Sequence, residues 1–390
     1  MENINIVITS DDGYIQPASV LITSILENSK YCKEIFFYFL DSGIKEYSKK
    51  ILKDICNNYG TNIKFLKIDS SIFENFYISH HIKHSSYYRI VATKYLPNHV
   101  EKFLYLDVDI VVNADIYNLF NYNLDGYILK AVKELQGYER IEELKIPNGK
   151  YFNAGVLLID RLKWDLFSVT EKTIEFINNN PSKLKYWDQD ALNAILYDSW
   201  GELSNLWNAQ TNLYYEIEEK MSFKEKKNID KQLFETYLIH YTSFAKPWHI
   251  LCYHPLRKYY YDYLKLTVFK EYNPMPKKIL ELLNEKEEII VFGTGTLAKH
   301  FKSLLKENNK IVAFLDNNKN SQGQKLYDIP ILEPSSIVSI EGLRNKKIFV
   351  CSSYYLEIEE QLVKMGLSEG QHFVEVKYGY NELLLGDIGE

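Results

Sequence analysis

Residues 103–112 read FLYLDVDIVV, a run that is apolar and rich in β-forming residues except for two carboxylates, Asp107 and Asp109. An uncompensated carboxylate in an apolar environment costs several kcal/mol, and two that lie close together also repel each other. If the run is one strand, alternation puts both acids on one face, with their Cα atoms about 6.5–7 Å apart. Such a pair either reaches solvent at a strand end or clamps a cation between its carboxylates.

The composition is that of a globular protein. The 390 residues are 46% hydrophobic and 25% charged, enough for two domains, and the net charge of −6 gives no reason to expect a nucleic-acid partner. The four cysteines have neither metal-ligand spacing nor the pattern of a disulfide framework, which fits a reducing compartment. The N-terminus lacks a signal-peptide pattern, and no apolar run is long enough to span a membrane. We therefore expect a cytoplasmic protein, either free or peripheral at the inner face of the membrane.

Strand and helix patterns alternate from the first residues onward. NIVIT (5–9), EIFFYFL (34–40) and IKFLKI (63–68) have the composition of strands, and helical patterns follow the first two. The alternation predicts an α/β fold with a parallel sheet, in which FLYLD (103–107) ends a further strand. Ligands of such sheets bind at the carboxyl ends of strands, so the two acids lie where an enzyme of this class has its site.

A second, smaller α/β pattern begins after EYNPMPKK (271–278), whose two prolines indicate a linker. We predict two domains, residues 1–272 and residues 273–390, the second a small Rossmann-like α/β domain. Gly293, Gly295 and Ala298 follow an apolar strand in a G-x-G-x-x-A pattern, and Asp316 ends the next strand. This pattern allows a nucleotide site, but a scaffold without a ligand, or a domain that docks an acceptor or forms a dimer, fits the short module better.

Polar residues interrupt apolar runs throughout the first domain: Asp11, Asp12, Arg89, Asn153, Asp188, Gln189, Asp190, His240 and Lys246. Each has a structural explanation when it is taken alone. Asp188 could cap a helix, His240 could be a satisfied core histidine, Asn153 could lie in a turn, and Arg89 could pair with a surface acid. The order of the motifs around them decides between these explanations and a shared site.

Four blocks, YLDVDIVV (105–112), YFNAGVLLID (151–160), WDQDALN (187–193) and IHYTSFAKPWH (239–249), together resemble family 8 glycosyltransferases. This family of retaining enzymes includes bacterial lipopolysaccharide galactosyltransferases and glycogenin, and the resemblance covers about residues 3–265. It implies the GT-A nucleotide-diphospho-sugar transferase fold, with a mixed, mainly parallel sheet.

The resemblance also implies a role for each matching position. The metal ligands would be Asp107, Asp109 and His240, holding Mn²⁺ or Mg²⁺. Thr9, Asp11, Tyr14 and Lys246 would bind the nucleotide. The donor sugar would contact Arg89, Asp107, Asn153, Ala154, Asp188 and Gln189, of which Asp188 and Gln189 would be catalytic. Gly13 departs from the family pattern, because an Asn that touches the nucleotide is frequent there.

The implied reaction moves glucose or galactose from UDP-glucose or UDP-galactose to a glycan, lipopolysaccharide or glycoprotein acceptor. A divalent ion would bridge the diphosphate and act as a Lewis acid, which explains why the two acids are tolerated. The resemblance favours a front-face reaction, since the amide of Gln189 is a poor nucleophile. Neither the sugar nor the acceptor can be named from the sequence.

Two other functions fit parts of the sequence. A haloacid-dehalogenase phosphatase also places DxD after an apolar strand, but its DxDGT pattern is missing after Asp109. A non-catalytic nucleotide-sugar-binding protein would not need Asp107, Asp109 and His240 intact. The basic, aromatic stretch 254–272 fits either a peripheral membrane contact or a helix that packs the two domains together, and we favour packing.

Overall fold

The structure, a computed structural model, describes residues 3–376 apart from 42, 74–75, 77–86, 215–235, 243–245, 250–251, 253, 275–276, 286–287, 306–308, 341, 344 and 353. The described chain divides into two compact units. The first contains the residues up to 242 together with 254–271, and the second contains those between 246 and 252 together with 272–376. Each unit has its own sheet and is described separately. Among the described residues, no helix has both the length and the apolarity needed to cross a bilayer.

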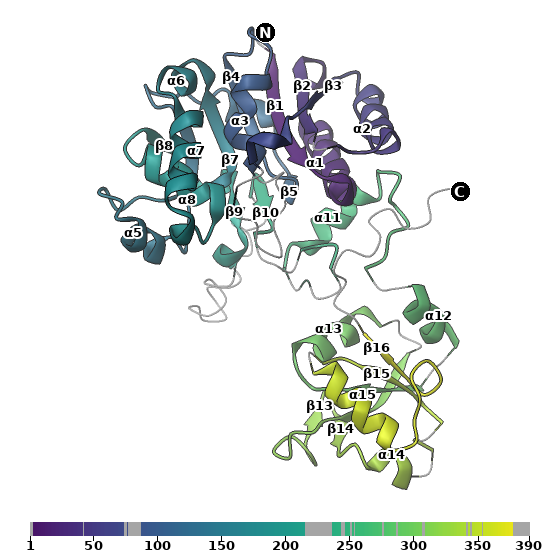
Figure 1. The fold of residues 1–390 in the computed structure, drawn as a ribbon. Coiled ribbons are helices and arrows are strands. Elements are labelled where there is room, and N and C mark those ends of the chain that lie inside the picture. The colour runs from purple at the N-terminus through teal and green to yellow at the C-terminus, as the bar shows by residue number, and fades with distance from the viewer. Residues whose placement is uncertain are drawn as a thin grey trace, which may run out of the picture. The chain divides into compact units, whose positions relative to one another are not determined.

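The first unit is built on a seven-stranded mixed sheet in the order β3-β2-β1-β4-β7-β6-β8 (Figure 1). Its strands are β1 (Ile4–Ser10), β2 (Ile35–Asp41), β3 (Asn62–Lys67), β4 (Lys102–Leu106), β6 (Leu129–Lys133), β7 (Phe152–Asp160) and β8 (Trp200–Glu202). Strand β7 runs antiparallel to both β4 and β6, and the other neighbouring pairs are parallel. The expected mixed, mainly parallel α/β sheet is confirmed.

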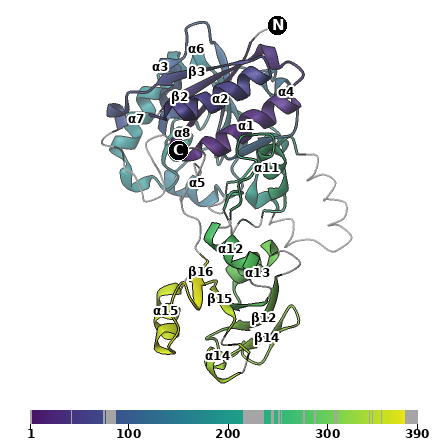
Figure 2. The same cartoon turned by 90° about the vertical axis from the view of Figure 1, so that its right-hand side faces the viewer.

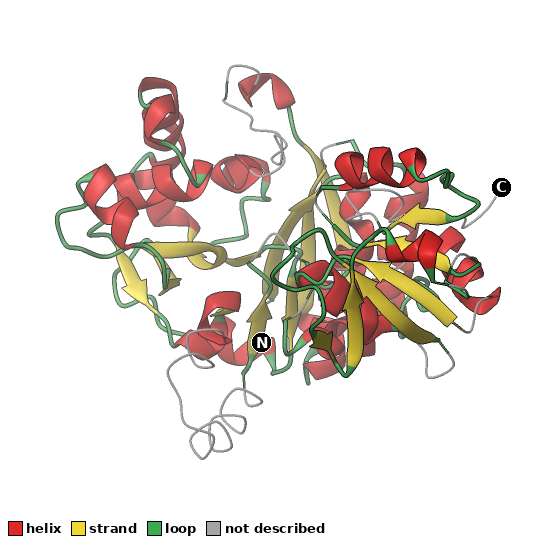
Figure 3. Cartoon of the chain, turned by 90° about the horizontal axis from the view of Figure 1, so that it is seen from below, coloured by secondary structure: helices red, strands yellow, loops and turns green. Residues whose placement is uncertain are grey.

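Helices cover both faces of this sheet, as Figure 3 shows. One group comprises α1 (Ile15–Asn28), α2 (Glu46–Asn58) and α11 (Arg257–Leu264), and Figure 2 shows them together. The other comprises α3 (Tyr88–Tyr95), α6 (Arg161–Leu166), α7 (Val169–Asn179) and α8 (Trp187–Leu196), and the short helices α4 (Ile116–Phe120) and α5 (Tyr138–Leu144) lie in connections. The residues of α1 from Ile15 to Leu26 are all buried, because α2, α11 and β5 (Ile110–Val112) pack on this helix.

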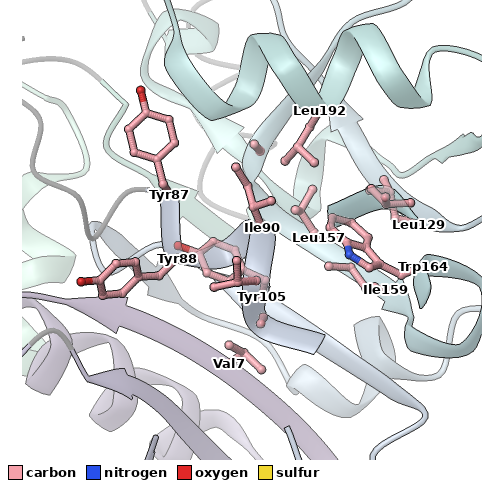
Figure 4. Close-up of a cluster of buried hydrophobic side chains, with 14 of the residues drawn as sticks. Val7, Tyr87, Tyr88, Ile90, Tyr105, Leu129, Leu157, Ile159, Trp164 and Leu192 are labelled. Carbon is pink, nitrogen blue, oxygen red and sulfur yellow. The ribbon is translucent and has the colours of Figure 1, made fainter. Parts of the chain in front are cut away.

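A large hydrophobic cluster lies between the sheet and the second group of helices (Figure 4). Ile90 of α3, Trp164 of α6 and Leu192 of α8 meet Tyr105, Leu129 and Leu157 of the sheet there. Side chains alternate along a strand, so Phe103 and Tyr105 of β4 and Leu129 and Ala131 of β6 join this cluster from the same face of the sheet. The packing fixes α3 and α8, the two helices that carry Arg89 and Asp188, against β4 and β7.

The DVD motif is not inside a strand. β4 ends at Leu106 and β5 begins at Ile110, so residues 107–109 form a bend between two sheets. Strand β5 belongs to a small sheet in the order β5-β10-β9, with β10 (Leu238–His240) and β9 (Ala209–Gln210). One end of the bend is tied to each sheet: the Asp107 N–H donates to Gly155 O at 2.9 Å, and the Tyr241 N–H donates to Asp109 O at 3.0 Å. The expectation that strand alternation orients the two acids is therefore wrong.

The second unit contains a six-stranded sheet in the order β13-β14-β12-β11-β15-β16, parallel except for the pair of β13 and β14. Its elements in chain order are α12 (Lys277–Glu285), β11 (Glu288–Phe292), α13 (Thr296–Leu304), β12 (Lys310–Leu315), β13 (Lys325–Leu326), β14 (Ile329–Leu332), α14 (Ser336–Ser339), β15 (Lys347–Val350), α15 (Tyr355–Lys364) and β16 (Phe373–Glu375). Two hydrophobic clusters lie on the two faces, and the strand order reverses at β11, as in doubly wound sheets.

Candidate functional site

The bend brings Asp107 and Asp109 close to His240, which lies more than a hundred residues further along the sequence. Each of the three offers one ligand atom, and these atoms all lie within 4.8 Å of one another. His240 Nε2 is 3.3 Å from Asp109 Oδ1 and 3.9 Å from Asp107 Oδ2. His240 ends β10 and pairs with Ile110 of β5, so the small sheet fixes its distance from the bend. Two carboxylates and one imidazole are a donor set that suits Mn²⁺ and, less well, Mg²⁺.

Gly155 makes room for this cluster. A Cβ atom at Gly155 would lie 2.2 Å from His240 Cε1 and 2.9 Å from Asp107 Oδ2, so no other residue fits without displacing both side chains. Gly155 lies within β7, a strand that is otherwise apolar and buried. No motif in the sequence singles out Gly155, although a lone glycine inside a buried strand signals a close approach by another group.

Arg89 joins the acidic cluster to the next group of residues. Its NH2 lies 3.0 Å from Asp107 Oδ1, its Nε lies 2.7 Å from Asp188 Oδ2, and it also donates to the carbonyl of Ala154. The guanidinium stacks 4.6 Å above the ring of Tyr105. Burial alone would lower the pKa of Arg89, but the two carboxylates raise it above its usual value. The pairing with a surface acid that the sequence allowed is therefore wrong.

Asp188 is buried in the first turn of α8, after Tyr186 at the N-cap position, so it is not the cap residue. Burial raises its pKa to about 6, Arg89 opposes the rise, and Asp107 adds to it. Trp187, directly before it, has a φ angle of +45°, a left-handed conformation that is rare for a bulky residue. Backbone strain of this kind concentrates at functional sites, where the surrounding contacts maintain it.

Gln189, Asn153 and Ala154 form a second polar group beside this pair. Gln189 Oε1 accepts from the Ala154 N–H at 2.9 Å, which places the start of α8 against β7. Asn153 donates to Glu134 Oε2 at 2.9 Å, and Gln189 Nε2 lies 3.5 Å from the same oxygen. Glu134, which follows β6, is not among the residues predicted from the sequence, although an acid directly after a buried strand is a signal of the same kind as Asp107.

Asp190 has a structural role in the described structure. Its carboxylate accepts from Arg140 Nε at 2.9 Å, from Tyr151 OH at 2.6 Å, and from the N–H groups of Lys185 and Tyr186 at 2.7 Å each. Asp190 is fully buried and Arg140 is 2% exposed. These bonds hold the first turn of α8, and therefore Asp188 and Gln189, in place.

The residues expected to bind the nucleotide are less closely grouped. Thr9 is buried in β1 and its hydroxyl donates to Leu40 O at 3.2 Å. Asp11 accepts from the Gly13 N–H at 2.8 Å and caps the short 3₁₀ turn of residues 12–14. Burial raises the pKa of Tyr14 to about 12, and the negative charges of Asp11 and Asp109 contribute, so Tyr14 lies near the acidic cluster. Lys246 belongs to the second unit, and its place beside the cluster stays a prediction.

Comparison with known proteins adds two family matches. The model of a family described as "Glycosyl transferase family 8" matches residues 5–252. A second model, described as "C2185-like, N-terminal", matches residues 285–373, within the second unit.

Curated relatives and solved structures match mainly the first unit. General stress protein A of Bacillus subtilis is 34% identical over 68% of this chain and 94% of its own length. A lipopolysaccharide 1,2-glucosyltransferase of Escherichia coli is 28% identical over 74% of this chain and 86% of its own length. The galactosyltransferase LgtC, solved with donor and acceptor sugar analogues, superposes with a TM-score of 0.60 at 24% identity over 68% of this chain and 96% of its own.

A match to a solved structure also extends over both units. The glycosyltransferase GlyE of Streptococcus pneumoniae has a TM-score of 0.54 at 17% identity and covers 95% of this chain and 92% of its own. Together with the match to LgtC, this likeness confirms the GT-A fold expected for the first unit.

Proposed function

Because the chain belongs to glycosyl transferase family 8 and is a glycosyltransferase, we propose that it moves a hexose from a UDP-sugar to a glycan acceptor. The hexose is glucose or galactose, and its anomeric configuration is retained. The observation that carries this proposal is the group of Asp107, Asp109 and His240, whose ligand atoms converge within 4.8 Å beside Arg89 and Asp188.

Asp107, Asp109 and His240 would hold a divalent cation, Mn²⁺ in preference to Mg²⁺ because one ligand is an imidazole. When bound, the cation supplies Lewis-acid stabilisation of the diphosphate that leaves the sugar. Gly155 supports the assignment, since it leaves the space in which His240 and Asp107 approach each other. Asp11, Thr9 and Tyr14 would hold the nucleoside, and Lys246 would bring a further positive charge to the diphosphate.

Asp188, Arg89 and Asn153 would orient the donor sugar. Asp188 is ionised above about pH 6 and already lies against Arg89, so the pair provides one acceptor and several donors for sugar hydroxyls. Its negative charge also stabilises oxocarbenium-like charge at the anomeric carbon. Glu134, bonded to Asn153, adds a second carboxylate on the same side.

Gln189 would position the sugar rather than attack it. Its carbonyl oxygen, the only atom of the amide with nucleophilic character, already accepts a hydrogen bond from Ala154. An engaged, neutral amide oxygen is a poor nucleophile. Retention by a front-face reaction, in which a leaving phosphate oxygen takes the acceptor proton, needs no nucleophile from the chain.

The acceptor would be a bacterial glycan. Relatives of this chain are named as lipopolysaccharide glucosyltransferases and a lipopolysaccharide galactosyltransferase. We propose a lipid-linked, lipopolysaccharide or glycoprotein acceptor, met in the cytoplasm or at the inner face of the membrane. Membership of family 8 leaves no support for the phosphatase alternative.

The test is hydrolysis of the donor by the full chain in the presence of Mn²⁺ and a panel of UDP-sugars. The rate of hydrolysis is measured as the release of UDP. We expect slow hydrolysis of UDP-glucose or UDP-galactose that stops with EDTA and returns when Mn²⁺ is added. Asp109→Asn should lower turnover by about a hundredfold or more, because the ion loses a charged ligand. Asp115→Asn, which changes a helix-capping acid outside the site, is the matched control. Hydrolysis that chelation does not affect would rule out the metal-bridged diphosphate.

A further inference from the structure

A chain of buried polar side chains links the sugar side of the site to the metal side. Asn153 Nδ2 donates to Glu134 Oε2 at 2.9 Å, and Asn208 Nδ2 donates to Asn153 Oδ1 at 2.9 Å. Asn208 Oδ1 in turn lies 2.8 Å from His240 Nδ1. Asn153, Asn208 and His240 are each no more than 5% exposed, so solvent does not compete for these bonds.

The donor and the acceptor of each hydrogen bond in this series can be assigned, because the series begins at a backbone N–H group, which can only donate. The backbone N–H of Gly155 donates to one end of the Asn153 amide at 3.0 Å, so the atom that it meets is the oxygen. The Asn208 atom that faces the same oxygen must then be the NH₂ group. The remaining Asn208 atom, which faces His240 Nδ1, is therefore the oxygen, and it can only accept.

We infer that Asn208 is a positioning residue that holds a proton on His240 Nδ1 and so leaves the Nε2 lone pair facing Asp107 and Asp109. This inference rests on the proposed function, in which His240 Nε2 binds a cation. A metal-binding histidine typically donates from its other ring nitrogen to an oxygen, which fixes the tautomer and the ring orientation. Nothing in the sequence patterns singled out Asn208 for this role.

Asn208 also contacts both the proposed metal ligand His240 and the proposed sugar-binding residue Asn153. Its backbone follows the 3₁₀ turn of Asn205–Trp207 and precedes β9, whose parallel pairing with β10 sets Asn208 near His240. Its amide reaches the Asn153 side chain, which in turn meets Glu134. A change at Asn208 therefore acts on two separable properties, cation affinity through His240 and handling of the donor sugar through Asn153.

Two substitutions separate these properties in the full-length protein. Asn208→Ala removes both bonds, and we expect Mn²⁺ affinity to fall about tenfold or more, measured from the EPR signal of free Mn²⁺ without any substrate. Asn208→Asp still accepts from His240 Nδ1 but cannot donate to Asn153. It should bind Mn²⁺ within about threefold of the unsubstituted protein, while donor hydrolysis at saturating Mn²⁺ remains as impaired as in the alanine variant.

Gln210→Ala is the matched control. Gln210 is another buried carboxamide, two residues further along the chain in β9, but its side chain bonds the backbone of Lys133 and Leu135 and not the ring of His240. It should leave Mn²⁺ affinity unchanged. The inference fails if Asn208→Ala binds Mn²⁺ normally, if Asn208→Asp is as weak as Asn208→Ala, or if Gln210→Ala weakens binding equally.

The position of the proton on the His240 ring can also be measured directly in the unsubstituted protein, so the result does not depend on whether the Asn208 variants fold. Nitrogen-15 NMR of histidine-labelled, metal-free protein at about pH 9, well above the usual imidazole pKa, reports which ring nitrogen of His240 carries hydrogen. The signal is assigned by its loss in His240→Gln. Hydrogen on Nδ1 supports the inference, and hydrogen on Nε2 overturns it. If the unsubstituted protein fails to bind Mn²⁺, the metal part of the proposed function fails, and this measurement still decides the role of Asn208.

Discussion

Gly155 limits the space of the proposed metal site. Its missing side chain leaves the space between His240 and Asp107, which a Cβ atom would enter at 2.2 and 2.9 Å. We expect Gly155→Ala to abolish measurable Mn²⁺ binding and to lower the free energy of unfolding by about 1–3 kcal/mol, as overpacked cores do. Mn²⁺ titration and urea unfolding measure the two effects.

Val156→Ala controls for damage to β7. Val156 is fully buried next to Gly155, and its truncation costs stability without placing an atom in the site. Normal Mn²⁺ binding by Gly155→Ala would mean that the cluster has more room than the structure gives it.

The raised pKa of Asp188 predicts how the rate of donor hydrolysis falls at acidic pH. Burial and Asp107 raise its pKa to about 6, so the carboxylate is present above that pH and gains a proton as the pH falls through it. If the ionised form orients the sugar, donor hydrolysis falls about tenfold per pH unit below the midpoint. A cation bound to Asp107 would cancel the part of the pKa rise that the negative charge of Asp107 causes. The midpoint of the fall in hydrolysis rate should therefore move to lower pH as the Mn²⁺ concentration increases.

Rates measured from about pH 8 to about pH 5, at low and at saturating Mn²⁺, test this prediction. Asp188→Asn should be slow at every pH and show no such midpoint. A profile of the unsubstituted protein that stays flat to about pH 5 would show that the charge of Asp188 is not needed.

The sequence revealed the acids, together with Asn153 and Gln189, but not Asn208 or Gly155, which support them. A carboxylate in an apolar run carries a large energetic penalty, so Asp107, Asp109 and Asp188 attract attention without any structure. Asn208 lies in an irregular connection with no periodicity, and its partners, Asn153 and His240, are distant in sequence. Such contacts depend on how β9 and β10 pair, which local patterns do not specify.

At the scale of elements, the order of strands and helices was predictable and the path of the chain at the site was not. The periodicity of the first three strands and of α2 matches the structure closely. The prediction that FLYLD (103–107) ends a strand matches β4, but nothing in FLYLDVDIVV indicates that the residues after the two acids belong to a second sheet. The turn at Asp107–Asp109 is imposed by pairing with β7 on one side and β10 on the other, both formed by later residues.

The N-terminus of α8 depends on a buried ion pair, which gives a prediction for stability. Asp190→Asn removes the charge opposite Arg140, which is 2% exposed, and breaking a buried pair on one side costs about 3–5 kcal/mol. We expect that loss in urea unfolding, together with slower donor hydrolysis because Asp188 and Gln189 lose their fixed position.

Glu143→Gln is the matched control, since Glu143 pairs with the same Arg140 from a solvent-exposed position. It should change neither stability nor hydrolysis appreciably. Equal effects of the two substitutions would mean that Asp190 is no more than a surface partner of Arg140.

At the scale of the whole molecule, each unit has what an independent domain needs. The first has a seven-stranded sheet and a large core, and the second has a six-stranded sheet with a hydrophobic cluster on each face. Two sheets with separate cores were predictable from the break in pattern near residue 273. The grouping of residues 246–252 with the second unit was not, because it rests on contacts such as the bond from Tyr272 OH to Trp248 O.

We therefore predict that residues 1–272 fold alone and hydrolyse the donor. The cut keeps Tyr272 with Trp248, and it leaves every strand of the seven-stranded sheet and the three proposed cation ligands, Asp107, Asp109 and His240, in the fragment. A fragment that ends at residue 270 lacks Tyr272 and should be less stable in urea, while both fragments retain the proposed ligands. Soluble expression, circular dichroism and UDP release compare the two fragments with the full chain. If residues 1–272 are insoluble while the full chain is soluble, the first unit needs the second to complete its core, and residues 272 and 273 do not mark a domain boundary.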